Sequence, residues 1–136
     1  MPQKINHIGI AVRDIEEAAR FYTEHLGLEI GGIEEVPDQK VKVAFLPIGE
    51  VRLELVQPTS PDSPVAKFLE KNGPGFHHIA YQVEDAGAEV ERLLAEGVRM
   101  VDQAPRSGAH HTRIAFVHPK ASGGVLTELV QELGHD

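Results

Sequence analysis

The chain has 136 residues, no cysteine, and 13 Lys and Arg against 21 Asp and Glu, which gives a formal net charge of −8. This length and a hydrophobic share of 41% are typical of one globular domain. The lack of cysteine excludes disulfides, thiolate metal sites and cysteine nucleophiles. The acidic balance argues against nucleic acid as a partner. No apolar run approaches the roughly 20 residues of a membrane span, so we expect a cytoplasmic protein without a membrane partner.

The first part of the chain predicts a strand, a helix and three further strands. Hydrophobic alternation over residues 5–12 is typical of a strand. Asp14 is a typical N-cap for a helix that runs to about residue 25, and Gly27 is a typical stop signal. Apolar segments between Gly, Pro and Asp then predict strands near residues 28–35, 41–47 and 51–57.

The second part of the chain repeats this order after a connection. Residues 57–64 are rich in proline and serine, and residues 65–71 predict a short helix. We then expect a strand, a helix that ends at Gly97, and three more strands, near residues 76–83, 86–96, 98–102, 112–117 and 124–131.

Two sequence repeats relate the halves. Residues 7–14 recur as residues 78–85 at an offset of 71 (78 minus 7), with His, Ile, Val and Asp kept in place. Glu54-Leu55-Val56-Gln57 recurs as Glu128-Leu129-Val130-Gln131 at an offset of 74 (128 minus 54). The repeats predict one domain, residues 1–136, made of two βαβββ modules. We expect the modules at residues 1–57 and 75–136, joined by a linker and short helix at 58–74.

A histidine opens each module and a glutamate closes it. Strand alternation places His7 and His78 on the face opposite the bulky apolar side chains that a helix would cover, and Glu54 and Glu128 also leave the apolar rows. A carboxylate within a strand is costly to bury unless it is paired or bound to a cation. Each residue taken singly could be a solvated surface group, but the recurrence in both halves favours a shared role. Two imidazoles and two carboxylates suit one Mn, Co, Ni, Zn or Fe(II) ion with open positions for substrate.

Several further motifs carry a resemblance to a known family. Residues 58–64 read Pro-Thr-Ser-Pro-Asp-Ser-Pro, residues 75–80 read Gly-Phe-His-His-Ile-Ala, and residues 113–126 include His-Pro-Lys and Gly-Gly-Val-Leu. With these motifs the chain resembles the vicinal oxygen chelate superfamily and, over nearly its whole length, the methylmalonyl-CoA epimerase family within it. The resemblance implies an α+β glyoxalase fold. In it, two βαβββ modules related by a pseudo-twofold form a cupped mixed sheet with the helices outside.

The resemblance also implies an activity and a site. The activity is a metal-dependent isomerase reaction of propionate metabolism, the epimerisation of methylmalonyl-CoA at C2 through a chelated enolate intermediate. His7, His78 and Glu128 match family metal ligands, Glu54 falls where the family has Gln or Glu, and Glu128 matches a glutamate thought to be both ligand and base. Co(II) is the expected ion, with Mn, Ni, Zn or Fe(II) as alternatives. An acyl-CoA substrate and a homodimer are implied as well.

The second proton-transfer group that an inversion needs stays open. Some relatives carry a glutamate in the strand that matches residues 41–45, where this chain has none. Glu35 and Asp38 lie nearby in sequence, but the direction of their side chains does not follow from the pattern. His110 and His111 stand where relatives often have Gly-Gly.

Candidates for substrate contacts lie in the final third of the chain. Arg113 and Lys120 could meet the phosphates of coenzyme A, although ordinary surface charge explains each equally well. The turn formed by Ser122, Gly123 and Gly124 could present backbone N–H groups to the substrate carboxylate.

Two other functions are possible on the same fold. A glyoxalase I-type enzyme would isomerise a glutathione hemithioacetal, and a sequestering protein of the bleomycin-binding type would hold its ligand without metal. Substrate competition separates the first from an epimerase, and metal analysis separates the second. The fold alone does not choose among them.

Overall fold

The computed structural model describes residues 1–134, so the last two residues of the predicted second module lie outside the described chain. The chain divides into two compact units. We call His7–His77 the N-terminal unit, and Met1–Asn6 together with the residues from His78 onward the C-terminal unit. Within residues 1–134, no helix is long and apolar enough to cross a membrane.

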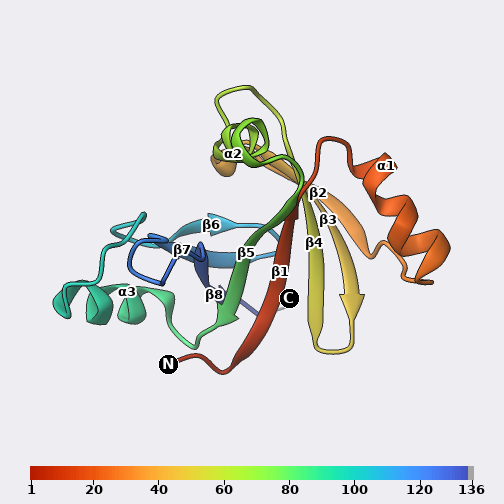
Figure 1. The fold of residues 1–136 in the computed structure, drawn as a ribbon. Coiled ribbons are helices and arrows are strands. Elements are labelled where there is room, and N and C mark those ends of the chain that lie inside the picture. Colours follow the sequence, from red (N-terminus) through yellow and green to blue (C-terminus); the bar gives the residue numbers. More distant parts are fainter. Residues whose placement is uncertain (135–136) are drawn as a thin grey trace. The chain divides into compact units, whose positions relative to one another are not determined.

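The strands form a mixed sheet of eight in the order β2-β3-β4-β1-β5-β8-β7-β6 (Figure 1). The pairs β1–β4 and β5–β8 are parallel, and β2–β3, β3–β4, β6–β7 and β7–β8 are antiparallel. This arrangement confirms the predicted glyoxalase-type sheet. The strands are β1 (Lys4–Ala11), β2 (Gly32–Val36), β3 (Val41–Ile48), β4 (Val51–Pro58), β5 (Gly75–Gln82), β6 (Arg106–Gly108), β7 (Thr112–Val117) and β8 (Thr127–Glu132).

In the N-terminal unit, helix α1 (Ile15–Arg20) packs on one face of strands β1, β3 and β4 (Figure 1). The Asp14 carboxylate caps this helix by accepting from the Glu16 N–H at 3.1 Å, as predicted. A turn of π-helix, η1 (Phe21–His25), continues the helix to the predicted end. The buried residues of this core are Val12, Ile15, Ala19, Ala44, Leu46 and Leu55.

In the C-terminal unit, helix α3 (Ala86–Ala95) packs on β7 and β8 in the same way. Asp85 caps it by accepting from the Ala88 N–H at 3.1 Å. The predicted connecting helix is α2 (Pro64–Asn72) of the N-terminal unit, which Ser63 caps. The buried residues beneath α3 are Val83, Ala86, Val90, Met100, Ala115, Val117 and Leu129.

The repeated Glu-Leu-Val-Gln motif anchors the first turn of each helix. The Gln57 side-chain oxygen accepts from the Ile15 N–H at 2.8 Å, and the Gln131 side-chain oxygen accepts from the Ala86 N–H at 2.9 Å. Both N–H groups belong to the helix donors that lack a partner within the helix. Because side chains alternate along a strand, the glutamate three residues earlier points to the face without the helix.

Three of the predicted strands are wrong in their limits, one of them being the strand predicted near residues 124–131, which begins only at Thr127 as β8. Residues 28–31 are not a strand, and β2 begins only at Gly32. Residues 98–102 contribute one bridge, Met100 with Val117, and the next strand is β6. The physical reason is Asp102, whose carboxylate accepts the Phe116 N–H at 2.8 Å, so a side chain takes the place of a neighbouring backbone carbonyl.

Candidate metal centre

The N-terminal unit buries an imidazole beside a carboxylate. His7 on β1 is 4% exposed, Glu54 on β4 is 5% exposed, and His7 Nδ1 lies 3.3 Å from Glu54 Oε2. The register of the two parallel strands pairs Glu54 with Gly9. Since Gly9 has no side chain, the glutamate lies next to a gap in the β1 row, and the imidazole of His7 reaches it from the adjacent position on the same face.

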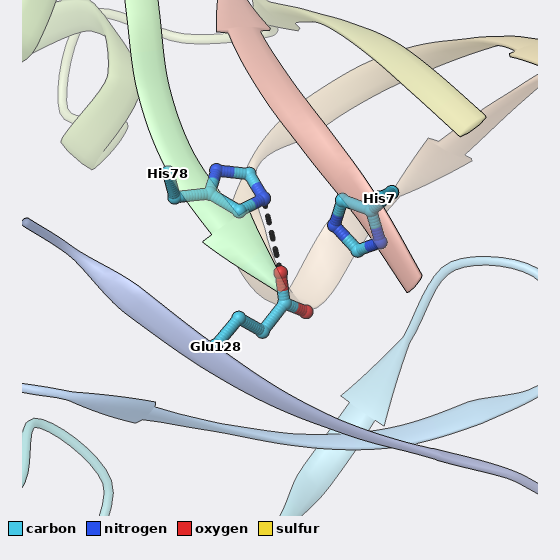
Figure 2. Close-up of side chains that lie close together, drawn as sticks. All are labelled: His7, His78 and Glu128. Atoms are coloured by element: carbon cyan, nitrogen blue, oxygen red, sulfur yellow. Dashed lines mark ion pairs between the residues drawn. The ribbon is translucent and has the colours of Figure 1, made fainter. Parts of the chain in front are cut away.

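The C-terminal unit repeats this arrangement with other atoms. His78 on β5 is 5% exposed, Glu128 on β8 is 4% exposed, and His78 Nε2 lies 3.0 Å from Glu128 Oε1. Here the small residue opposite the glutamate is Ala80. Figure 2 shows this ion pair, together with the His7 imidazole that β1 carries. The predicted equivalence of the two His–Glu pairs is therefore present in the local structure of each unit.

An aromatic ring and a guanidinium group lie next to each glutamate. Phe45 pairs with Glu54 across β3 and β4, and Arg52 lies over the Phe45 ring at 5.7 Å. Phe116 pairs with Glu128, and Arg106 lies over the Phe116 ring at 5.9 Å. Sequence reasoning did not single out either phenylalanine. The alternation signal could have found Arg52, which stands two residues before Glu54 and so shares its face.

The guanidinium group of the N-terminal unit also interacts with the glutamate itself. Arg52 Nη2 lies 3.6 Å from Glu54 Oε2, so Glu54 has an imidazole and a cation beside it. In the C-terminal unit, the Arg106 Nε group lies 3.1 Å from the Asp102 carboxylate. The two arginines therefore differ in their acidic partners, although both lie on a phenylalanine ring.

The donor chemistry of these residues fits a divalent metal. A buried carboxylate needs a positive partner, and a neutral imidazole supplies only a lone pair or a hydrogen bond. A divalent cation satisfies both kinds of group at once. His7, His78 and Glu128 are a set of buried donors that suits such an ion, and their types match the nitrogen and oxygen ligands of Mn, Fe, Co, Ni and Zn.

The two predicted cationic substrate contacts are exposed. Arg113 pairs with Gln131, and both lie on the face that carries α3, opposite the face of Glu128. Lys120 lies in the turn after β7, where its backbone N–H donates to His118 Nδ1 at 3.0 Å. Desolvation and the positive charges of Arg99 and Lys120 lower the pKa of the His118 imidazole. Contact of Arg113 or Lys120 with a substrate stays a prediction.

The glycine turn before β8 is held by its own hydrogen bonds. The Gly124 N–H donates to the Pro119 carbonyl at 2.7 Å, and the Ser122 hydroxyl donates to the Val125 carbonyl. Gly123 and Gly124 both have positive φ, +75° and +102°, so the turn favours glycine at these positions. Their contact with a substrate carboxylate also stays a prediction.

The predicted candidates for a second proton-transfer group lie away from the two glutamates or at the surface. Glu35 is exposed and pairs with Lys42, which places it on the helix-covered face of the N-terminal unit. Asp38 is exposed in the short turn η2 (Pro37–Gln39). His110 and His111 are exposed between β6 and β7, with φ of 61° and 56°.

Comparison with known proteins places this geometry in a family. Residues 6–116 match the model of the Glyoxalase/Bleomycin resistance protein/Dioxygenase superfamily. The chain is 43% identical over 130 residues to the ethylmalonyl-CoA/methylmalonyl-CoA epimerase of Cereibacter sphaeroides, covering 94% of this chain and 97% of the relative. It is 40% identical over 129 residues to the mitochondrial methylmalonyl-CoA epimerase of Homo sapiens, covering 94% and 73%.

A solved structure extends the likeness to three dimensions. It is a methylmalonyl-CoA epimerase in complex with methylmalonyl-CoA and NH4+, with 40% identity and a TM-score of 0.94. The match covers 98% of this chain and 97% of the other. The chain therefore belongs to the glyoxalase/bleomycin resistance protein/dioxygenase superfamily and is a close relative of the methylmalonyl-CoA epimerases within it.

Proposed function

We propose that this chain interconverts the two C2 epimers of methylmalonyl-CoA. The observation that carries the proposal is the match over 98% of the chain, at a TM-score of 0.94, to an epimerase solved with that substrate. The buried His–Glu pair in each unit supplies groups suited to the reaction. An epimerase inverts one carbon, so no oxidant, reductant or second substrate is required.

The proposed metal ligands are His7, Glu54, His78 and Glu128. Their burial and their imidazole and carboxylate chemistry support this assignment, since four such donors would bind a divalent ion and leave positions for substrate oxygens. Co(II) is the proposed ion, with Mn, Ni, Zn and Fe(II) as alternatives to be tested. A bound divalent ion would act as a Lewis acid on the thioester carbonyl and so make the proton at C2 more acidic.

Glu128 is the proposed acid/base group on one face of C2. Its carboxylate is 4% exposed, and Phe116 on the neighbouring strand provides apolar surface beside it. A carboxylate shielded from water takes and returns a proton without competition from bulk solvent. The His78 Nε2 atom lies 3.0 Å from the Glu128 carboxylate, so the two groups are close enough to bind one ion together.

Assembly, location and the coenzyme A contacts are further parts of the proposal. A homodimer is expected from the family resemblance, and light scattering after gel filtration tests it. A cytoplasmic location is tested by cell fractionation. Arg113 and Lys120 are proposed to meet coenzyme A phosphates, and Ser122, Gly123 and Gly124 to meet the substrate carboxylate.

Proton NMR of methylmalonyl-CoA in deuterated water tests the proposed function. EDTA-treated protein is compared with the same protein after addition of Co(II), and His78→Ala is compared with His25→Ala, which changes an exposed histidine on α1's π-helical extension. We expect metal-dependent loss of the C2 proton signal and interconversion of the epimers, abolished in His78→Ala and kept in His25→Ala. A folded, metal-loaded protein that causes neither change would overturn the proposal, and turnover of a glutathione hemithioacetal would replace it with glyoxalase chemistry.

A further inference from the structure

We propose that Glu34 is the second proton-transfer group, acting on the face of C2 opposite to the one that Glu128 serves. This inference rests on the proposed function. Inversion at carbon requires removal of a proton from one face and delivery of a proton to the other. A single fixed carboxylate would return the proton to the face from which it came, so a second acid/base group is needed.

The strand register of the N-terminal unit places Glu34 on the same face as Glu54. In β2 and β3, Glu34 pairs with Val43. In β3 and β4, Phe45 pairs with Glu54. Directly paired residues share a face, and so do residues two apart on one strand, so Glu34, Val43, Phe45 and Glu54 all point to the side without α1.

Glu34 stands out among the acidic residues of these strands. On the face of β1 to β4 that carries His7, the acidic side chains are Glu34 and Glu54. Glu35, the next residue, pairs with Lys42 and points to the opposite face. The register of β2 on β3 therefore selects Glu34 and not Glu35, which is one of the candidates that sequence reasoning had considered.

The surroundings of Glu34 are partly apolar, which suits a group that contacts an acyl chain. Its side chain is half-buried, with buried Val43 opposite it on β3 and buried Val36 beside it on the same face of β2. Gly32, the other neighbour on that face, has no side chain. Strands β2 and β4 are separated by β3, which puts them about 10 Å apart at the usual strand spacing.

The proposed step balances in protons and electrons. In one direction the Glu128 carboxylate takes the C2 proton, and the electron pair of the C–H bond moves into the enolate of the thioester. Glu34, present as the carboxylic acid, then gives its proton to the opposite face of C2 and becomes a carboxylate. Glu128 ends protonated, so the enzyme is set for the reverse direction.

The matched variants Glu34→Gln and Glu35→Gln test this assignment. Each epimer is incubated separately in deuterated water with the Co(II)-loaded protein, and both C2 deuterium incorporation and inversion are followed by NMR. We expect Glu34→Gln to lower the inversion rate by about 100-fold or more, within the range of a lost acid/base group. It should still incorporate deuterium with retention into one epimer, the one whose proton Glu128 removes. Glu35→Gln should invert both epimers at the wild-type rate.

Two further readouts separate proton transfer from a structural role. Metal content and the thermal unfolding midpoint of Glu34→Gln should equal those of wild type, and Glu34→Asp should recover part of the inversion rate. Inversion by Glu34→Gln at close to the wild-type rate would overturn the inference, as would loss of deuterium incorporation into both epimers. If wild-type protein neither exchanges nor inverts, the proposed function itself fails, and that result is distinct from a failure specific to Glu34.

Discussion

Replacement of Glu128 by glutamine should have opposite consequences in the metal-free and metal-loaded protein. The Glu128 carboxylate is 4% exposed and lies 3.0 Å from His78 Nε2. Glutamine keeps the shape and one accepting oxygen but removes a buried charge. Without a bound cation the buried carboxylate carries a desolvation cost that the neutral amide lacks, and the amide oxygen can still accept a hydrogen bond from His78, so we expect the metal-free variant to be as stable as wild type or up to about 1 kcal/mol more stable.

Metal binding should reverse this order. An ion that binds only the folded state stabilises it by about 2.7 kcal/mol when its concentration is 100 times the dissociation constant. For a domain of this length, 1 kcal/mol corresponds to roughly 3–5 °C in the unfolding midpoint, so the wild-type midpoint should rise by about 10 °C. Glu128→Gln lacks a charged donor and should lose most of that rise.

Thermal unfolding followed by circular dichroism, with EDTA and then with excess Co(II), measures both effects. The control is Glu96→Gln, at an exposed glutamate that pairs with Arg92 on α3 and should respond to Co(II) as wild type does. If Glu128→Gln lowers the midpoint by the same amount with and without Co(II), Glu128 is a structural partner of His78 and the ligand assignment is refuted.

Three other predictions follow from local contacts. Gln57→Ala and Gln131→Ala should each cost about 1–3 kcal/mol in urea unfolding, because each leaves a buried helix N–H without its acceptor. Gly108→Ala should cost about 1–3 kcal/mol in the same assay, since an added Cβ would lie 2.7 Å from the buried Ile114 side chain. In a proton NMR titration, His118 should titrate with a pKa below its ordinary value of 6.5. Because the folded state then binds fewer protons than the unfolded state at low pH, the contribution of His118 to the free energy of unfolding should fall as the pH drops below 6.5.

Each of these has a control. The control Gln3→Ala changes an exposed residue before β1 and should leave the urea midpoint unchanged. An equal loss of stability in Gln3→Ala and Gln57→Ala would contradict the role of Gln57 in anchoring the helix. Gly32→Ala places its Cβ 3.9 Å from the Phe45 ring and should be tolerated. Lys120→Ala removes one of the nearby charges and should move the His118 pKa upward, and no movement would disprove the electrostatic part of the explanation.

Local chemistry made most elements predictable. The caps at Asp14 and Asp85 and the alternation over β1 and β5 are short-range features, and the structure places those helices and strands where the pattern predicted them. Residues 98–102 were misassigned because a valine-rich segment satisfies a strand pattern equally well whether or not it is paired. Whether this segment forms a regular strand depends on Asp102, whose side chain accepts a hydrogen bond from the Phe116 N–H of β7.

The same distinction between short-range features and strand pairing applies to the residues of the site. The side on which His7, Glu54, His78 and Glu128 project follows from alternation, and their repetition indicated a common role before any contact was known. The aromatic neighbours come from adjacent strands, as Phe45 of β3 does for Glu54 and Phe116 of β7 does for Glu128. Their identity depends on which strands pair and in what register, and that information is not local.

What the sequence by itself determined is therefore the order of elements, the helix caps and the faces of His7, Glu54, His78 and Glu128, because these depend on residues a few positions apart. Only the tertiary structure shows that Glu34, and not Glu35, lies on the same face as Glu54. The turn at Pro37–Gln39 and Lys40, whose φ is +56°, sets the register of β2 on β3. A shift of one residue there would turn Glu35 toward the face of Glu54 and Glu34 away from it, because a strand's side chains change face at every residue.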